Sequence, residues 1–139
     1  MRYLFVTLDA GGNVYPELAL AGRLVARGHD VRLLGHRSQR AAIERAGCAF
    51  RPYEHAPDFD ATQSATSPIK DWADDPATVF AALCDHLWFG PAGRVAADVA
   101  VELERHPADA LAVDYFVFGG LAAAEKAGLP TAVLWHTAF

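Results

Sequence analysis

TLDAGGNVYPELALAGRL, residues Thr7 to Leu24, joins an apolar run to a helical pattern through two glycines and an asparagine. The apolar run, Tyr3 to Leu8, is rich in β-forming residues and is typical of a strand buried on both faces of a parallel sheet. From Pro16 the pattern becomes helical until Gly28 stops it, with apolar residues at Leu18, Ala21, Leu24 and Val25. The stretch therefore predicts a strand followed directly by a helix.

The same unit repeats along the chain. Ser38 can cap the second helix and Gly47 can end it, while Gly90 and Pro91 interrupt a long third helical stretch and predict a kink or two successive helices. Further strands are expected at 30–35, 48–54, 109–114 and 130–139, and helices at 38–47, 76–106 and 117–128. Strands that alternate with helices predict an α/β fold, a Rossmann-like parallel sheet flanked by helices.

Glu54 to Asp75 breaks this rhythm, because it is rich in Pro, Asp, Ser and Thr and has no apolar period. Loops longer than about 12 to 15 residues in compact domains are usually functional or disordered. Two interpretations stay open: a lid or binding loop, and a disordered segment.

Composition excludes several classes of protein. The 139 residues suit one domain, 53% of them are hydrophobic, and the net charge of −5 argues against binding to nucleic acid or to anionic membranes. Cys48 and Cys84 lack the paired spacing of metal or redox motifs, and the N-terminal apolar run is too short for a signal peptide or a membrane span. We expect a soluble, cytoplasmic protein with reduced thiols. A homodimer is an assembly that the sequence leaves open.

Polar residues gather where the predicted strands end. Ligands of open α/β sheets bind outside the carboxyl ends of the strands, so a site is expected among Asp9, Asn13, His36, Asp114, His136 and Thr137. His29 falls at the opposite end of the sheet and is interpreted as structural.

No phosphate-binding fingerprint occupies the first loop. The dinucleotide motif needs G-x-G-x-x-G after the first strand and an acid at the end of the second, whereas this chain has GGNVYP and ends its second strand with Gly35-His36. No Gly-Lys-Ser/Thr follows either. We therefore expect no bound nicotinamide or flavin cofactor.

The segment GGNVYPELALAGRLVARGHDVRLLG resembles the opening of the nucleotide-sugar-dependent glycosyltransferases of the two-domain GT-B type, family 1. The likeness is greatest to the bacterial enzymes that decorate antibiotics and other natural products. DYFVFGGLAAAEKAGLP, Asp114 to Pro130, matches a later element of their pattern. The resemblance extends over essentially the whole chain.

The resemblance implies that residues 1–139 form an N-terminal acceptor-binding domain, without the C-terminal domain that binds the donor. The donor would be a UDP or dTDP sugar and the acceptor an aromatic or polyketide-like small molecule. In such enzymes a His or Asp of the first loop deprotonates the acceptor hydroxyl, an Asp after the fourth strand orients the His, and the oxygen attacks the anomeric carbon with inversion. That scheme requires no metal, and the domain alone would be inactive.

Asn13 stands at the base position, and a neutral amide cannot take a proton from a hydroxyl. The hypothesis that follows makes Asp114 or His136 the base, with Asn13 orienting the acceptor. The residues expected to contact substrate are Gly11 and Gly12, whose small size leaves room, together with Trp72, Trp88, Phe116 and Thr137.

Structural roles compete with these assignments. Asn13 could cap the first helix, Asp114 could cap the next helix or close a turn, and His136 could pack beside Trp135. Asp9 is expected to serve the turn after the first strand. Core packing is the favoured explanation for most of Phe80, Leu83, Leu87 and Trp88, because their spacing is helical.

Two other functions remain open. A transferase of lipid-linked sugars would keep the fold, although the acidic balance of the chain speaks against it. A non-catalytic binding or helper domain would explain the absence of both a donor site and a first-loop base.

Overall fold

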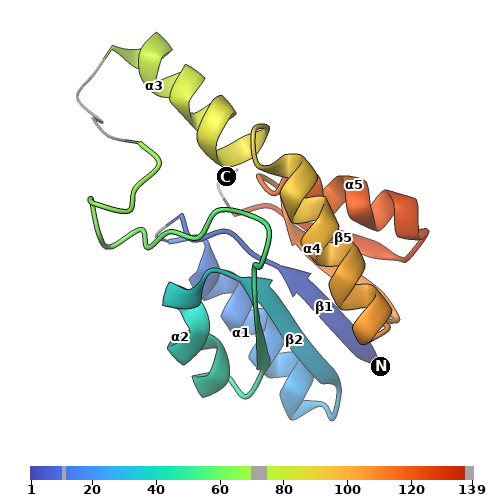
Figure 1. Ribbon diagram of the computed structural model, residues 1–139. Coiled ribbons are helices and arrows are strands. Elements are labelled where there is room, and N and C mark those ends of the chain that lie inside the picture. Colours follow the sequence, from blue (N-terminus) through green and yellow to red (C-terminus); the bar gives the residue numbers. More distant parts are fainter. Residues whose placement is uncertain (11, 70–74, 137–139) are drawn as a thin grey trace.

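The computed structural model describes residues 1–10, 12–69 and 75–136 of the chain. Its centre is a sheet of five parallel strands in the order β3-β2-β1-β4-β5 (Figure 1). The strands are β1 (Arg2–Val6), β2 (Asp30–Gly35), β3 (Ala49–Pro52), β4 (Ala110–Asp114) and β5 (Thr131–Leu134). The predicted α/β fold is confirmed. β2 has its expected bounds, and the other four strands are shorter than their expected ranges.

The strand order places a topological switch at the centre of the sheet. β1 pairs with β2 on one side, where Phe5 lies opposite Leu33, and with β4 on the other, where Val6 lies opposite Val113. The chain builds outward from β1 to β3 and then returns to add β4 and β5 on the opposite side. Ligands of open sheets bind at such a switch, beyond the carboxyl ends of β1 and β4.

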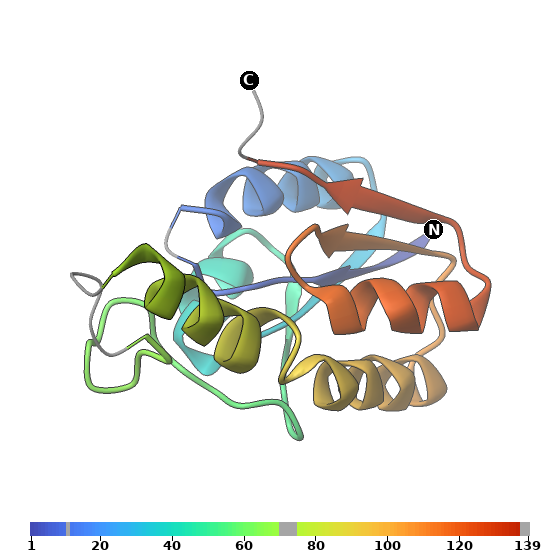
Figure 2. The same ribbon diagram turned by 90° about the horizontal axis from the view of Figure 1, so that it is seen from above.

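Helices cover both faces of the sheet (Figure 2). One face packs against α1 (Val14–Ala26) and α2 (Arg40–Arg45), the other against α4 (Ala92–Arg105) and α5 (Phe118–Ala127). Successive strand residues point to opposite faces, so neighbours in β1 enter different cores. Phe5 belongs to the core under α1 and α2, whereas Leu4 and Val6 belong to the core under α4 and α5. Within the described ranges, no helix is long and apolar enough to cross a membrane.

The predicted break at Gly90-Pro91 is confirmed, with a π-helical turn before it. α3 (Pro76–Leu83) runs into this turn (Cys84–Trp88), and α4 begins at Ala92. A Cβ at Gly90 would lie 1.7 Å from the carbonyl oxygen of Asp85, so only glycine permits this approach. π-helical turns are rare and are often found at functional sites.

Of the four residues for which core packing was mostly expected, Phe80 is the exception, while Leu83, Leu87 and Trp88 are half-buried. The Phe80 side chain is 59% exposed, and α3 has no buried residue. The reason lies in the topology, because α3 stands beyond the carboxyl edge of the sheet (Figure 1), where no strand lies beneath it.

Ser38 does not cap a helix as predicted. It lies inside a short 3-10 turn (Arg37–Gln39) that precedes α2, and its hydroxyl donates to Asp9 Oδ2 over 2.5 Å. The same Asp9 oxygen accepts the N–H of Ala61 over 3.2 Å. Asp9 thus ties the loop after β1 to two later segments, a wider role than the local turn expected of it.

The described part of the predicted long loop, residues 54–69, has no regular structure but is held in place. Asp98 of α4 is buried and accepts the backbone N–H groups of Glu54, His55 and Ala56 over 2.9 to 3.2 Å. Further along, Ile69 is only 3% exposed. The segment is therefore anchored at its start by Asp98 and packs against the protein again at Ile69, while residues 61–66 between them are exposed.

Candidate active site

Asp114, the last residue of β4, is the centre of the candidate site. Its side chain is fully buried although it is a carboxylate. Oδ1 accepts the N–H of Phe116 over 2.8 Å, and Oδ2 accepts Nδ2 of Asn13 over 3.2 Å. The turn-closing role considered for Asp114 is therefore real, and the carboxylate also reaches across the switch point to the loop after β1.

Asn13 does not cap α1, so that alternative was wrong. It precedes the helix but has helical backbone angles, and its side chain makes no capping hydrogen bond. The amide instead donates to Asp114. A neutral donor placed against a buried carboxylate stabilises the ionised form of that carboxylate.

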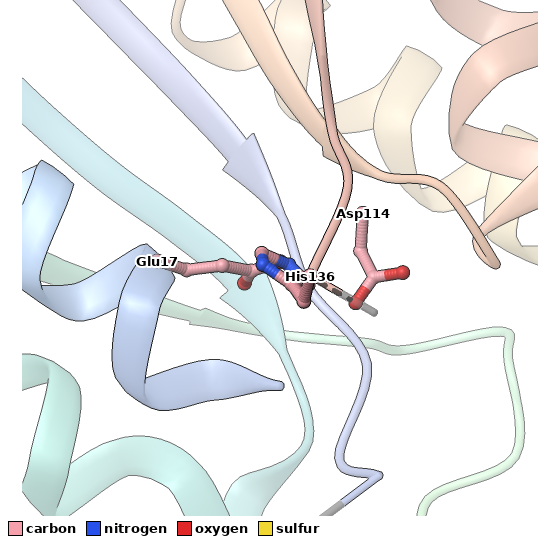
Figure 3. Close-up of side chains that lie close together, drawn as sticks. All are labelled: Glu17, Asp114 and His136. Carbon is pink, nitrogen blue, oxygen red and sulfur yellow. Dashed lines mark hydrogen bonds and ion pairs between the residues drawn. The ribbon is translucent and has the colours of Figure 1, made fainter. Parts of the chain in front are cut away.

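His136, which follows β5, closes the site from the far side (Figure 3). Its Nε2 lies 3.0 Å from Glu17 Oε1 and 3.7 Å from Asp114 Oδ2. Packing beside Trp135 does not account for its position, because Trp135 is 61% exposed and stacks on Tyr115. The structure brings Asn13, Asp114 and His136 together, as the sequence predicted.

Glu17 is the member of this group that sequence reasoning missed. It lies on α1, is 1% exposed, and points toward His136 (Figure 3). The buried residues of α1 are Val14, Glu17 and Ala21, spaced three and four apart. A carboxylate on the apolar stripe of a helix was the signal available in the sequence.

Burial changes the acidity of both carboxyl groups. Burial, and next the neighbouring Asp114, raise the pKa of Glu17 to about 9. Burial also raises the pKa of Asp114, while the donors Phe116 N–H and Asn13 lower it in part. This shift favours the protonated form of Glu17 over its ionised form.

The donor set of this cluster also has the composition of a cation site. One ligand atom each from Glu17, Asp114 and His136 lies within 4.8 Å of the other two. Among the described residues, these three form the group of possible metal ligands that lie this close together. A proton on Glu17 removes the same excess of negative charge, so the cluster does not require a cation.

An apolar cavity lies beside the site, between the carboxyl edge of the sheet and the π-helical turn. Its free volume is only about 30 Å³, about that of one water molecule, and its lining includes Leu8, His36, Tyr53, Phe59, Trp88 and Val117. Trp88 stacks on Phe116 with ring centres 4.6 Å apart and an interplanar angle of 7°. Because Phe116 donates its N–H to Asp114, this aromatic pair connects the cavity to the carboxylate.

His36 contributes to the cavity more than the sequence suggested. It is 3% exposed, and its ring packs 4.2 Å from that of Phe59 and 5.2 Å from that of Tyr53. Burial lowers its pKa, an effect that the nearby Asp58 carboxylate opposes. His36 therefore lines the pocket as a neutral ring at pH 7.

The remaining predicted residues have separate outcomes. Gly12 is exposed, and a Cβ placed on it would meet nothing within 4 Å, so there is open space beside the first loop. His29 lies at the amino-terminal edge beside Tyr3, away from the site as expected. Three predicted contact residues, Gly11, Trp72 and Thr137, lie outside the described residues.

Comparison with known proteins identifies the kind of domain. Residues 3–130 match the model of the glycosyltransferase family 28 N-terminal domain. The 4'-demethylrebeccamycin synthase of Lentzea aerocolonigenes is 30% identical over 131 residues, which are 94% of this chain and 31% of that protein. The chain thus spans less than a third of the length of this curated relative.

Solved structures share the fold. The kitacinnamycin glycotransferase superposes with a TM-score of 0.69 at 22% identity, over 94% of this chain and 29% of that one. The glycosyltransferase SnogD from Streptomyces nogalater gives 0.68 at 20% identity, over 96% and 33%. The GT-B relationship inferred from the sequence is confirmed, and the matching family model is numbered 28 where the resemblance pointed to family 1.

Proposed function

Because this chain belongs to the glycosyltransferase family 28 N-terminal domain family, we propose that it is the acceptor-binding domain of an inverting glycosyltransferase. The acceptor is a small natural product with a flat aromatic or polyketide-like body. The observation that carries the proposal is the position of Asp114: a buried carboxylate at the switch point, joined through Phe116 to an aromatic-lined cavity.

In the proposed reaction the acceptor body lies against the aromatic rings at the mouth of the cavity, and one hydroxyl reaches the loop after β1. Asn13 orients that hydroxyl, and Asp114 takes its proton. The oxygen then forms a bond to the anomeric carbon of a nucleoside-diphosphate sugar, while the bond from that carbon to the diphosphate breaks and the diphosphate leaves with the electron pair. The donor is held by another part of a longer protein. His136 is the alternative base.

The binding half of the proposal is tested on the chain itself by calorimetry with flat polycyclic aromatic phenols. Replacing Trp88 with Ala removes one ring of the stacked pair, and we expect affinity to fall about tenfold, since aromatic contacts contribute about 0.5–1.5 kcal/mol beyond their buried area. Leu20→Ala is the control, because this exposed side chain of α1 does not line the cavity. Equal losses in the two variants would place the acceptor elsewhere.

The catalytic half is tested by sugar transfer in a gene product that joins this domain to a donor half. General-base catalysis contributes about 10²- to 10⁴-fold, so Asp114→Asn should lower kcat by at least about 100-fold. Near-normal turnover in Asp114→Asn would exclude Asp114 as the base.

A non-catalytic helper domain is the second candidate, and the neutral Asn13 is the observation that favours it. The two candidates differ in outcome. A helper would bind the aromatic ligands but support no transfer with any donor sugar.

A further inference from the structure

Glu17 is a buried carboxyl group with few hydrogen-bond donors around it that could stabilise a negative charge. Its Oε1 faces His136 Nε2 at 3.0 Å, whereas Oε2 has no hydrogen-bond partner among the described residues. Asp114, by contrast, is partnered at both oxygens, by the Phe116 N–H and by Asn13. The two carboxyl groups therefore differ sharply in how well the surrounding protein would stabilise a negative charge.

Other groups near Glu17 supply no permanent positive charge. Asp114 faces it from β4, where a hydrogen bond between the two carboxyl groups also raises the pKa of Glu17, and His136 faces it from the segment after β5. Tyr53, after β3, is near enough for Glu17 to raise its pKa, but its hydroxyl donates to the carbonyl of Thr7. An ionised Glu17 would be a second anion beside Asp114 in a buried site, and such pairs retain a proton on one member.

We propose that Glu17 is a positioning residue that holds the proton of this cluster as a neutral carboxylic acid and donates it to Nε2 of His136. Asp114 is then the single anion of the site. The raised pKa of Glu17 agrees with this assignment, which follows independently from the distances and from the unequal partners of the two carboxyl groups.

A proton on Glu17 also bears on which residue is the base of the transfer reaction, a conclusion that rests on the proposed function. If Nε2 of His136 accepts a proton from Glu17, the hydrogen of the neutral ring sits on Nδ1. Neither ring nitrogen is then free to deprotonate an acceptor. Of the two bases left open above, Asp114 is the one that remains.

The proton is located directly by NMR on the 139-residue chain. We expect the side-chain carboxyl carbon of Glu17 to titrate near pH 9, as burial raises its pKa to about 9, and His136 Nε2 to be unprotonated at pH 7. The exposed Glu125 supplies a reference signal, and Glu17→Gln assigns the Glu17 resonance. Titration of Glu17 at about 4 to 5, with protons on both nitrogens of His136, would overturn the proposal.

Two variants separate this role from simple packing. In Glu17→Gln an amide N–H can still donate to His136, so the ring should keep its Nδ1–H form and transfer in the two-domain protein should stay within about threefold of wild type. Glu17→Leu cannot donate, and transfer should fall about tenfold, the equivalent of one hydrogen bond.

The outcomes distinguish this inference from the proposed function. Absence of acceptor binding or transfer in the wild-type protein would refute the function, while the NMR titration would still decide the proton. Loss of transfer in Glu17→Gln equal to that in Glu17→Leu would refute the role of Glu17 alone. Inactivation by a chelator, reversed by Zn²⁺, would also refute it, because both carboxylates would then be ionised around a cation.

Discussion

Asp114 is stabilised as an anion by neutral groups. Its two partners, an amide side chain and a backbone N–H, carry no charge, and its burial opposes ionisation. An asparagine at position 13 therefore does more than remove the base found in the first loop of similar enzymes. It converts the residue at position 13 into a fixed donor for Asp114, which keeps this carboxylate charged next to the neutral Glu17.

The role of Asn13 predicts an unusual stability pattern for Asn13→Asp. The new carboxylate would lie against Asp114, where the amide now donates over 3.2 Å. At pH 7 we expect its free energy of unfolding to be about 1–2 kcal/mol below that of Asn13→Ala, because like charges repel at this distance. The gap should shrink at pH 5, as urea unfolding followed by circular dichroism would show. Equal stability of the two variants at pH 7 would mean that the position-13 side chain does not face Asp114.

At the scale of elements, Asp98 attaches the irregular segment 54–69 to α4. One carboxylate serves three consecutive backbone N–H groups and also lies 2.6 Å from His55 Nδ1. The segment in turn supplies Phe59 to the cavity. The shape of the cavity wall thus depends on a residue of α4 that does not line it.

Asp98→Ala should release the start of this segment. We expect amide hydrogen exchange at residues 54–56 to accelerate and stability to fall by about 2–3 kcal/mol, since several buried N–H groups lose their acceptor. Asp60→Ala is the matched control, because among the described residues the Asp60 carboxylate accepts from its near neighbours Thr62 and Gln63 and from no residue outside the segment. Comparable acceleration at 54–56 in the two variants would argue against the anchor.

Much of the fold could be predicted because its signals are local. Hydrophobic periodicity and glycine stops gave the strand–helix order, and the strand ends gave Asn13, Asp114 and His136 as neighbours. Glu17 was not predicted because its partner His136 lies 119 residues away, and only the packed sheet brings them together. Phe80 was misplaced for a related reason: helical spacing does not reveal whether a sheet lies beneath the helix.

At the scale of the whole molecule, the buried side chains of His36 and Glu17 act on stability in opposite directions. His36 stays neutral in the folded state because burial lowers its pKa, so unfolding takes up a proton below about pH 6.5 and stability falls on that side. Glu17 stays protonated in the folded state and is ionised in the unfolded chain above about pH 4.5. Unfolding then releases a proton, so stability falls as the pH rises from that value toward 9.

Glu17→Gln should remove the alkaline half of this dependence. In the wild-type chain the free energy of unfolding should fall between pH 7 and pH 8 by up to about 1.4 kcal/mol, the value for one proton per pH unit. An amide has no proton to release, so Glu17→Gln should lose far less over the same interval, whereas the control Glu125→Gln should follow the wild type. Urea unfolding at pH 6, 7 and 8 measures the three slopes. A Glu17→Gln slope equal to that of the wild type would show that Glu17 is ionised in the folded protein, and Asp114 would then share its site with a second anion.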